Sequence, residues 1–311
     1  MSSRTAATLH VTNGDSVIYL FKKAGILGTH VPWRDALHEG PLNAELQLEA
    51  HSRMRGEYLA NRGLGNPIKI LHDFSSRDST LARAADFEEV VLWFEHDLYD
   101  QLQILQILVE LDNLQLEPGR VSIVQSDSYL GSMIADEIVA LHPKRRTVTA
   151  QTFSHARTAW NAVGSASPAA LLALTERDIP SLPFLRSAAR RLCEEYPWAS
   201  DGLSRTQRQA LQAVAQGPAR LEELFNRSQS REETVFLGDR MFYAVLDDLR
   251  TDAAPLIEED GATLALTALG RRLLSGDGDW LDVASCERFV GGVSIKGSSS
   301  PRWNDDRQCF A

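Results

Sequence analysis

The sequence predicts an α/β protein, with an open, mostly parallel sheet domain followed by a smaller, winged-helix-like α+β domain. In the first half, strand-like apolar runs alternate with helical patterns, which is typical of parallel sheets. In the second half, three helical patterns precede two short strand patterns around a turn. The 311 residues, of which 43% are hydrophobic and 24% charged, suffice for two domains with separate cores.

The first half opens with a short strand and a polar turn, after which apolar residues recur at helical spacing up to Gly25. Residues 31–41 hold Pro and Gly without a clear period, so we expect a loop there. The apolar run at 89–94 indicates a strand that is covered on both faces, and a helix with a broad buried face follows it from Leu98. The expected strands are 9–12, 89–94, 121–124 and 147–150, and further helices are expected at 43–62 and 76–86.

The second half begins with a helical pattern at 185–193 that stops before Pro197. Ser204 to Gln207 resembles a capping box, which opens a helix that Gly217 and Pro218 close. Two more helical patterns lie around 221–225 and 241–249, and Asp260-Gly261 separates strands at 255–258 and 262–267. We therefore expect a sheet domain over 1–165, a helical connector over 166–200 and a winged-helix-like domain over 201–311.

Charge makes DNA an improbable partner for that second domain. The whole chain has a formal net charge of −10, and residues 201–311 hold 13 Arg and Lys against 18 Asp and Glu. Asp247-Asp248 on the third helix and Glu258-Glu259-Asp260 at the hairpin tip would repel phosphates, whereas affinity for DNA comes mainly from cations. A protein partner for residues 201–311 is the better prediction.

The compartment predicted from the sequence is the cytoplasm, with no membrane partner. The longest apolar run near the predicted site has five residues, far fewer than the roughly 20 of a transmembrane helix, and the chain lacks the apolar segment of a signal peptide at its start. Cys193, Cys286 and Cys309 are widely spaced and odd in number, which favours reduced thiols.

Polar side chains gather where the predicted strands end. In open α/β sheets, ligands bind beyond the carboxyl ends of the strands, so the turn after the first strand should meet the segment after the strand at 89–94. We expect small-molecule ligand contacts from both segments and one helical turn further on. These residues are Asn13, Gly14, Asp15, Ser16, Glu95, His96, Asp97, Asp100 and Gln101.

Helix capping explains part of this pattern without any ligand. Asp97 precedes a helix and suits the N-cap, with Asp100 three residues later, and Asn13 or Asp15 could cap the first helix. Capping leaves Glu95 and His96 unexplained, because neither adds to a cap and both cost desolvation if they are buried.

The sequence gives little support to two possible roles of the Asn13–Ser16 turn, a nucleophilic serine and a phosphate-binding turn. Gly-Asp-Ser after a first strand opens the GDSL-type hydrolases, but residues 120–165 lack the Asp-x-x-His pair that they need. A glycine turn at a helix N-terminus can bind phosphate through backbone N–H groups. Only one glycine stands here, instead of a full Gly-x-Gly-x-x-Gly.

A metal centre is a third hypothesis. His38-Glu39 in the loop and Glu95-His96-Asp97 at the sheet edge offer imidazole and carboxylate ligands. Two histidines with a carboxylate suit zinc, iron or manganese, and the set His38, His96 and Asp97 could hold such an ion if the loop folds back. Alternatively, His38 forms hydrogen bonds within its own loop.

Trp33-Arg34-Asp35 offers a possible ligand clamp. A Trp beside an Arg can stack on a planar ligand and bind an anion through the guanidinium group. The simpler alternative is a surface pair between Arg34 and Asp35, with Trp33 in the core.

Several blocks of the sequence resemble an uncharacterised bacterial family, the domain of unknown function 1835. The three N-terminal blocks are residues 9–16, 32–41 and 91–102, and residues 182–185 and 201–208 resemble that family's second half. The resemblance implies no activity. It does favour a functional site, since the blocks coincide with the segments selected above on chemical grounds.

The leading hypothesis is a cytoplasmic enzyme, such as a metal-assisted hydrolase or transferase, that acts on a small polar ligand, for example a phosphorylated or nucleotide-like one. His96 or His38 would act as a general base or metal ligand, and Glu39, Glu95 and Asp97 would act as catalytic carboxylates. The alternative is a non-enzymatic regulatory or protein-binding module that uses the winged-helix half.

Overall fold

The fold is described by a computed structural model, which covers residues 8–285 and 287–311. A five-stranded sheet in the order β2-β1-β3-β4-β5 forms its N-terminal half. The first four strands pair in parallel and β5 lies antiparallel at one edge, so the predicted open, mostly parallel sheet is confirmed. The strands are β1 (Thr8–Thr12), β2 (Thr29–Pro32), β3 (Glu89–Phe94), β4 (Val121–Gln125) and β5 (Arg146–Thr147).

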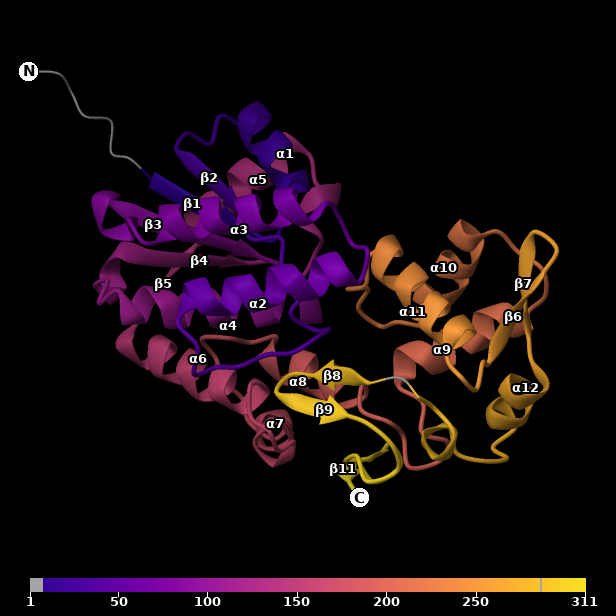
Figure 1. The fold of residues 1–311 in the computed structure, drawn as a ribbon. Coiled ribbons are helices and arrows are strands. Elements are labelled where there is room, and N and C mark those ends of the chain that lie inside the picture. Colours follow the sequence, from indigo (N-terminus) through magenta and orange to yellow (C-terminus); the bar gives the residue numbers. More distant parts are fainter. Residues whose placement is uncertain (1–7, 286) are drawn as a thin grey trace, which may run out of the picture.

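Alternate residues of the central strand β3 face two different cores. Val91 and Trp93 pack with Val17 and Phe21 in a small core beneath α1 (Ser16–Ala24) and α5 (Ala135–Leu141). The opposite face belongs to a large core that includes the almost wholly buried helix α4 (Leu98–Asn113). Further helices of this half are α2 (Leu48–Asn61), α3 (Pro67–Leu81), α6 (Ala150–Val163) and α7 (Ala169–Thr175), with α2 and α3 side by side in Figure 1.

Four of the expected elements in this half differ from the structure in kind or position. Residues 29–32 form the edge strand β2, whose last two residues fall in the loop expected at 31–41, and only Val31 of this strand is buried. The helix expected at 43–62 begins later, at Leu48. The helix expected at 76–86 begins earlier, at Pro67, because Asn66 caps α3 and Pro67 opens it. The strand expected at 147–150 ends at Thr147, since Thr149 caps α6 through a capping box with Thr152.

The second half contains the predicted helices followed by the predicted hairpin (Figure 1). Ser204 and Gln207 form the expected capping box at the start of α9. The hairpin turns at Gly261 and pairs Ile257 with Leu266. The elements are α8 (Leu185–Cys193), α9 (Arg205–Ala215), α10 (Leu221–Gln229), α11 (Asp239–Thr251), β6 (Ile257–Asp260), β7 (Thr263–Leu266) and α12 (Ala268–Leu274).

A second hairpin, β8 (Arg288–Val290) and β9 (Val293–Ile295), returns to the N-terminal half. The backbone N–H of Leu42 donates to the Gly291 carbonyl at 3.0 Å, and the Gly292 N–H donates to the Val163 carbonyl at 3.0 Å. Gly291 has a φ of +57°, and a Cβ there would lie 2.2 Å from the Val163 carbonyl oxygen. The two-residue strands β10 (Trp303–Asn304) and β11 (Cys309–Phe310) close the chain.

One large hydrophobic core contains residues of both halves, from Leu9 to Trp303. Contacts therefore cross the predicted boundaries at 165 and 200, and the division into three domains stays a prediction. Within the described residues, no helix combines the length and apolar character that crossing a membrane requires. Cys193 and Cys309 are free thiols, and Cys286 lies outside the described residues.

Candidate functional site

Three carboxylates gather where β3 ends and α4 begins. Glu95, Asp97 and Asp100 each have an oxygen within 4.8 Å of those of the other two. Their exposed fractions are 5%, 4% and 0%. The carboxyl edge of a parallel sheet is where ligands are expected, so the structure brings these predicted site residues together at the predicted place.

The local sequence holds these three side chains in place through backbone contacts. Asp97 caps α4, and its Oδ1 accepts from the Asp100 N–H at 3.0 Å, which confirms the capping prediction. Asp100 Oδ1 in turn accepts from the Glu95 N–H at 2.6 Å, and its Oδ2 accepts from Asn13 Nδ2 at 2.9 Å. Glu95 Oε1 accepts from the Leu130 N–H at 2.8 Å. The carboxylates that hold the start of α4 in place are thus among the predicted site residues.

These carboxylates form no ion pair with any residue that the structure describes. Burial raises the pKa of Glu95. Burial, with a smaller contribution from the charge of Glu95, raises the pKa of Asp97 to about 7. Burial and the charges of Asp97 and Glu95 raise the pKa of Asp100 well above its ordinary value. Three buried acids with no counter-ion are costly to ionise, which is the electrostatic environment that a bound cation would relieve.

Gln101 carries a buried amide oxygen in the first turn of α4. The side chain is fully buried, and its Nε2 donates to the Glu95 carbonyl at 2.7 Å. Its Oε1 is buried without a hydrogen-bond partner in the described chain. Carboxylate and amide oxygens suit the hard cations Mg²⁺, Mn²⁺ and Ca²⁺ better than zinc, so the residues present fit a divalent cation of that kind.

The predicted metal set of His38, His96 and Asp97 is not what the structure brings together. Among residues 8–285 and 287–311, the group of possible donors at this edge consists of the three carboxylates and contains neither histidine. His96 lies with its ring 5.1 Å from that of Tyr129, and its Nδ1 is buried without a partner within the described part of the chain. His38 lies in the wall of other cavities, because the loop folds toward α2 and α11.

A cavity of about 560 Å³ opens beside Asp97 and His96, between the two halves of the chain. Its other walls come from α8, from the start of α9, from the segment between α10 and α11, and from the C-terminal segment. Arg190 is exposed and forms no ion pair with a described residue. The charged lining residues are Asp97, Arg190, Arg191, Glu194, Arg205, Glu232, Glu233 and Asp305.

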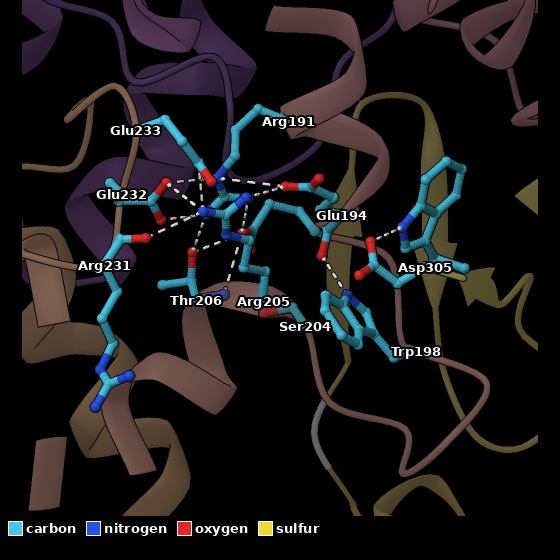
Figure 2. A network of polar contacts seen from close by, with 12 residues as sticks. Arg191, Glu194, Trp198, Ser204, Arg205, Thr206, Arg231, Glu232, Glu233 and Asp305 are labelled. Carbon is cyan, nitrogen blue, oxygen red and sulfur yellow. Dashed lines mark hydrogen bonds and ion pairs between the residues drawn. The ribbon is translucent and has the colours of Figure 1, made fainter. Parts of the chain in front are cut away.

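Figure 2 shows the ion-pair network in the wall of this cavity. Arg191 donates from Nε and Nη2 to the two Glu232 oxygens at 2.9 and 2.8 Å, and from Nη1 to Glu195 at 2.7 Å. Arg205 binds Glu194 at 2.7 Å and Glu233 at 2.5 Å. Burial acts to raise the pKa of Glu195, but the neighbouring guanidinium groups, first Arg191, hold it below its ordinary value. The network fixes the segment after α10 to α8 and α9.

The Asn13–Ser16 turn contributes only in part. Asn13 contacts Asp100, as above, but Asp15 at the N-cap position of α1 makes no side-chain cap hydrogen bond. Asp15 instead pairs with Arg34, whose Nε and Nη2 lie 2.7 and 2.5 Å from its two oxygens. The expected capping by Asn13 or Asp15 is therefore wrong. Ser16 begins α1, and Gly14 accepts a hydrogen bond from Thr12 Oγ1 at its carbonyl.

The predicted clamp of Trp33 and Arg34 is also wrong. Trp33 is 0% exposed and its Nε1 donates to Gln106 at 2.8 Å, so its ring cannot stack on a ligand. The alternative surface pair of Arg34 with Asp35 is not formed either, although Trp33 does lie in the core. Asp35 is fully buried beside Arg55, with an ion pair of 3.0 Å, and accepts nothing from Arg34.

His38 and Glu39 lie apart from the three carboxylates. Glu39 Oε1 accepts from the Tyr58 hydroxyl at 2.9 Å and from Arg62 Nε at 3.0 Å. Burial raises the pKa of Glu39, and Arg62 partly offsets this. His38 is 6% exposed and neither ring nitrogen has a partner among the described residues. The expected hydrogen bonds of His38 within its loop are not formed.

Sequence reasoning missed the buried charged residues of α8, α9 and the segment after α10. Arg191, Glu195 and Glu232 define one wall of the large cavity, and none was selected. The spacing of Arg191 and Glu195 at i and i+4 is a signal that could have drawn attention to this helix.

Comparison of the chain with models of known protein families gives no match, and comparison with curated proteins gives none either.

Proposed function

We propose that the protein is a metal-assisted enzyme that acts on a small polar ligand, such as a phosphorylated or nucleotide-like one, in the cavity beside Asp97. The observation that carries the proposal is the set of three buried carboxylates at the end of β3, with raised pKa values and no counter-ion among the described residues. A relationship of the chain to the domain of unknown function 1835, which its sequence blocks resemble, is part of this proposal.

The cation would be held by Glu95, Asp97 and Asp100, with Gln101 Oε1 as a further oxygen. When bound, such a cation polarises a substrate oxygen or an attacking water. Asp97 also lines the cavity, so the cation would lie at the cavity's inner end. This arrangement supports a hydrolase or transferase.

The side chains around the cavity have separate tasks in this proposal. Arg190 carries a charge that no described ion pair uses, so it would bind an anionic group of the ligand. His96 lies in the same wall, with Nδ1 buried and unpartnered within the described chain, and would carry a proton to or from the reacting oxygen. The ion pairs of Arg191 and Arg205 would hold the opposite wall in position.

The test is titration of the purified full chain with Mn²⁺, followed by electron paramagnetic resonance, in the wild type and in Asp97→Asn. Asn is as good an N-cap as Asp, so the substitution should preserve α4. Asp127→Asn is the matched control, because Asp127 is exposed and belongs to the loop after β4. We expect wild type and control to bind about one Mn²⁺, and Asp97→Asn to bind at least about tenfold more weakly.

Equal Mn²⁺ binding by all three proteins, or none by the wild type, would contradict the cation site. If the site is confirmed, the Mn²⁺-loaded enzyme is screened against phosphomonoesters and phosphodiesters. The same variant then reports whether turnover depends on Asp97.

We also propose that α9, α10, α11 and the β6–β7 hairpin form a winged-helix-like unit that packs against protein. The order of its elements fits that class, and Asp248 on α11 pairs at 2.6 Å with Arg62, the residue that follows α2. The helix that would read DNA in such a unit therefore contacts the N-terminal half. Steeply salt-dependent retention on heparin would contradict this.

A further inference from the structure

A second cavity of about 570 Å³ lies on the other side of the segment that joins α10 to α11. The proposed function does not use it. Tyr99 in the first turn of α4 lines this cavity, while Asp97 lines the first one. Residues 232–234 line the first cavity and Phe236 lines the second, so one segment separates them.

The walls of the second cavity are largely apolar and aromatic. Phe74, Phe236 and Met241 are at most 8% exposed. The rings of Tyr99 and Phe236 lie 5.9 and 5.0 Å from the ring of His38, tilted or edge-on to it. Such walls suit a planar ring, because aromatic groups attract one another in edge-on and offset geometries.

His38 adds an unsatisfied polar group to this apolar wall. The side chain is 6% exposed, and neither Nδ1 nor Nε2 has a partner in the described chain. Burial lowers the pKa of His38 to about 4, so the ring is neutral near pH 7 and offers one donor and one acceptor. A buried imidazole without partners is unfavourable, and a ligand with a polar edge would relieve that cost.

Cations collect at the rim of the same cavity, in a chain that is acidic overall. Arg34, Lys69 and Arg240 line it against the single carboxylate of Asp73. Arg240 is exposed and forms no ion pair with a described residue. Arg34 has a φ of +44°, a left-handed conformation that is uncommon for a residue with a side chain. Its guanidinium group pairs with Asp15 at 2.5 Å and with Asp73 at 3.1 Å.

We propose that this second cavity binds a planar aromatic or heteroaromatic anion, with the ring among Tyr99, Phe236 and Phe74, a polar edge of the ring on His38, and the anionic group near Arg240 and Lys69. The first cavity lies next to carboxylates, whereas this one has more cations than carboxylates at its rim. The two cavities therefore favour different groups. The binding of the anion does not require the cation site.

The test uses the full chain and three probes in isothermal titration calorimetry. The first, 6-hydroxy-2-naphthoate, carries the ring, a polar edge and a negative charge. The second, 2-naphthoate, lacks the hydroxyl group, and the third, 6-hydroxy-2-naphthamide, lacks the charge. We expect the first to bind the wild type most tightly, and the neutral amide to bind about tenfold more weakly, as is typical of charge-assisted contacts.

Two variants locate the probe. Arg240→Gln should weaken binding of 6-hydroxy-2-naphthoate about threefold or more, while Arg231→Gln, an equal charge change at an exposed residue outside this cavity, should not. His38→Leu should abolish the difference between the probes with and without the hydroxyl group, since that difference measures the contact with His38. Thermal unfolding checks that His38→Leu is folded, and Arg240→Gln tests the proposal independently if it is not.

Absence of binding to the wild type at about 1 mM probe, equal effects of the two arginine variants, or an unchanged hydroxyl preference in folded His38→Leu would each overturn the proposal. Asp97→Asn separates this site from the proposed cation site. We expect that variant to lose Mn²⁺ and to keep 6-hydroxy-2-naphthoate, so either site can fail without the other.

Discussion

Arg62, which directly follows α2, and Asp248 of α11 form a two-point ion pair that joins the two halves of the chain. Nη1 and Nη2 of Arg62 lie 2.6 and 2.8 Å from the two Asp248 oxygens, and Nε donates to Glu39 at 3.0 Å. The Arg62 side chain is only 21% exposed. One arginine thus links the loop after β2, helix α2 and helix α11.

Asp248→Asn should therefore lower the free energy of unfolding by about 1–2 kcal/mol, because a partly buried two-point pair is lost. Asp247→Asn is the matched control. The Asp247 side chain is 60% exposed and pairs with Arg250 on the same helix. We therefore expect Asp247→Asn to lower the free energy of unfolding by less than about 0.5 kcal/mol. Urea unfolding measures both. Equal losses of stability in the two variants would show that the ion pair between Arg62 and Asp248 contributes no more than the exposed pair on α11.

Asp35, expected from the sequence to bind ligand, should prove a structural residue. It and Arg55 are both 0% exposed, and Arg77 lies 3.7 Å away. Replacing Asp35 with Asn should destabilise the protein by about 3–5 kcal/mol, since the buried Arg55 guanidinium loses its counter-ion and Arg77 keeps only its pair with Asp78 at 3.1 Å. Urea unfolding would show this as a lower midpoint. An Asp35→Asn protein of wild-type stability that loses ligand binding would restore the original hypothesis.

Gly291 should tolerate no side chain. Gly291 and Gly261 both turn hairpins with left-handed φ values, +57° and +62°. A Cβ at Gly291 would lie 2.2 Å from the Val163 carbonyl oxygen, whereas a Cβ at Gly261 meets nothing within 4 Å. Ala at Gly261 should cost about 1 kcal/mol from backbone strain alone, and Ala at Gly291 should cost about 1–3 kcal/mol more. Thermal unfolding of Gly261→Ala and Gly291→Ala measures the difference in stability. Similar losses in the two variants would contradict the close approach of Gly291 to the Val163 carbonyl.

Burial of His10 should make stability depend on pH. Burial lowers the pKa of His10 to about 4. The charges of His30 and His142 also lower it, to a smaller extent, whereas the hydrogen bond to the Leu27 carbonyl and the charge of Glu89 raise it. The unfolded chain therefore binds this proton first, and His10 contributes stability that is present above about pH 6.5 and is lost as the pH falls toward 4. The loss attributable to His10 should be roughly 2–3 kcal/mol at most.

The measurement is urea unfolding between pH 4 and 7.5 for the wild type, His10→Gln and His72→Gln. His10 Nδ1 accepts from Trp93 Nε1 at 3.0 Å, and the Gln side chain can still offer an acceptor there. His72, with a side chain 80% exposed, is the control substitution. If the free energy of unfolding of His10→Gln depends on pH as steeply as that of the wild type over this range, His10 is not the source of the pH dependence.

Local patterns in the sequence suffice for the central strands and for the carboxylate cluster. The apolar runs of β3 and β4 and the buried face of α4 were predicted, and the cluster follows because Glu95, Asp97 and Asp100 lie within six residues of one another at a strand end. Edge strand β2 was missed, since it buries only Val31 and so lacks an apolar run. The start of α3 is marked by a capping signal, Asn66-Pro67, and not by apolar periodicity, which alone places the helix too late.

The division of the sheet edge into two cavities could not be predicted. It depends on Phe236, which comes from the far half of the chain and packs between His38 and Arg191, with the Arg191 guanidinium 4.9 Å from its ring. No local pattern records such a contact. The same holds for Asp35 and Arg55, whose burial as an ion pair depends on how α2 packs against the loop after β2.

The return of the β8–β9 hairpin also bears on how the protein is made. Leu42 finds the partner of its backbone N–H only when Gly291 arrives, 249 residues later in the chain. Contacts between residues so distant along the chain close slowly. The Leu42 N–H therefore stays without this partner until Gly291 has been synthesised, so this part of the N-terminal half completes its contacts late in folding.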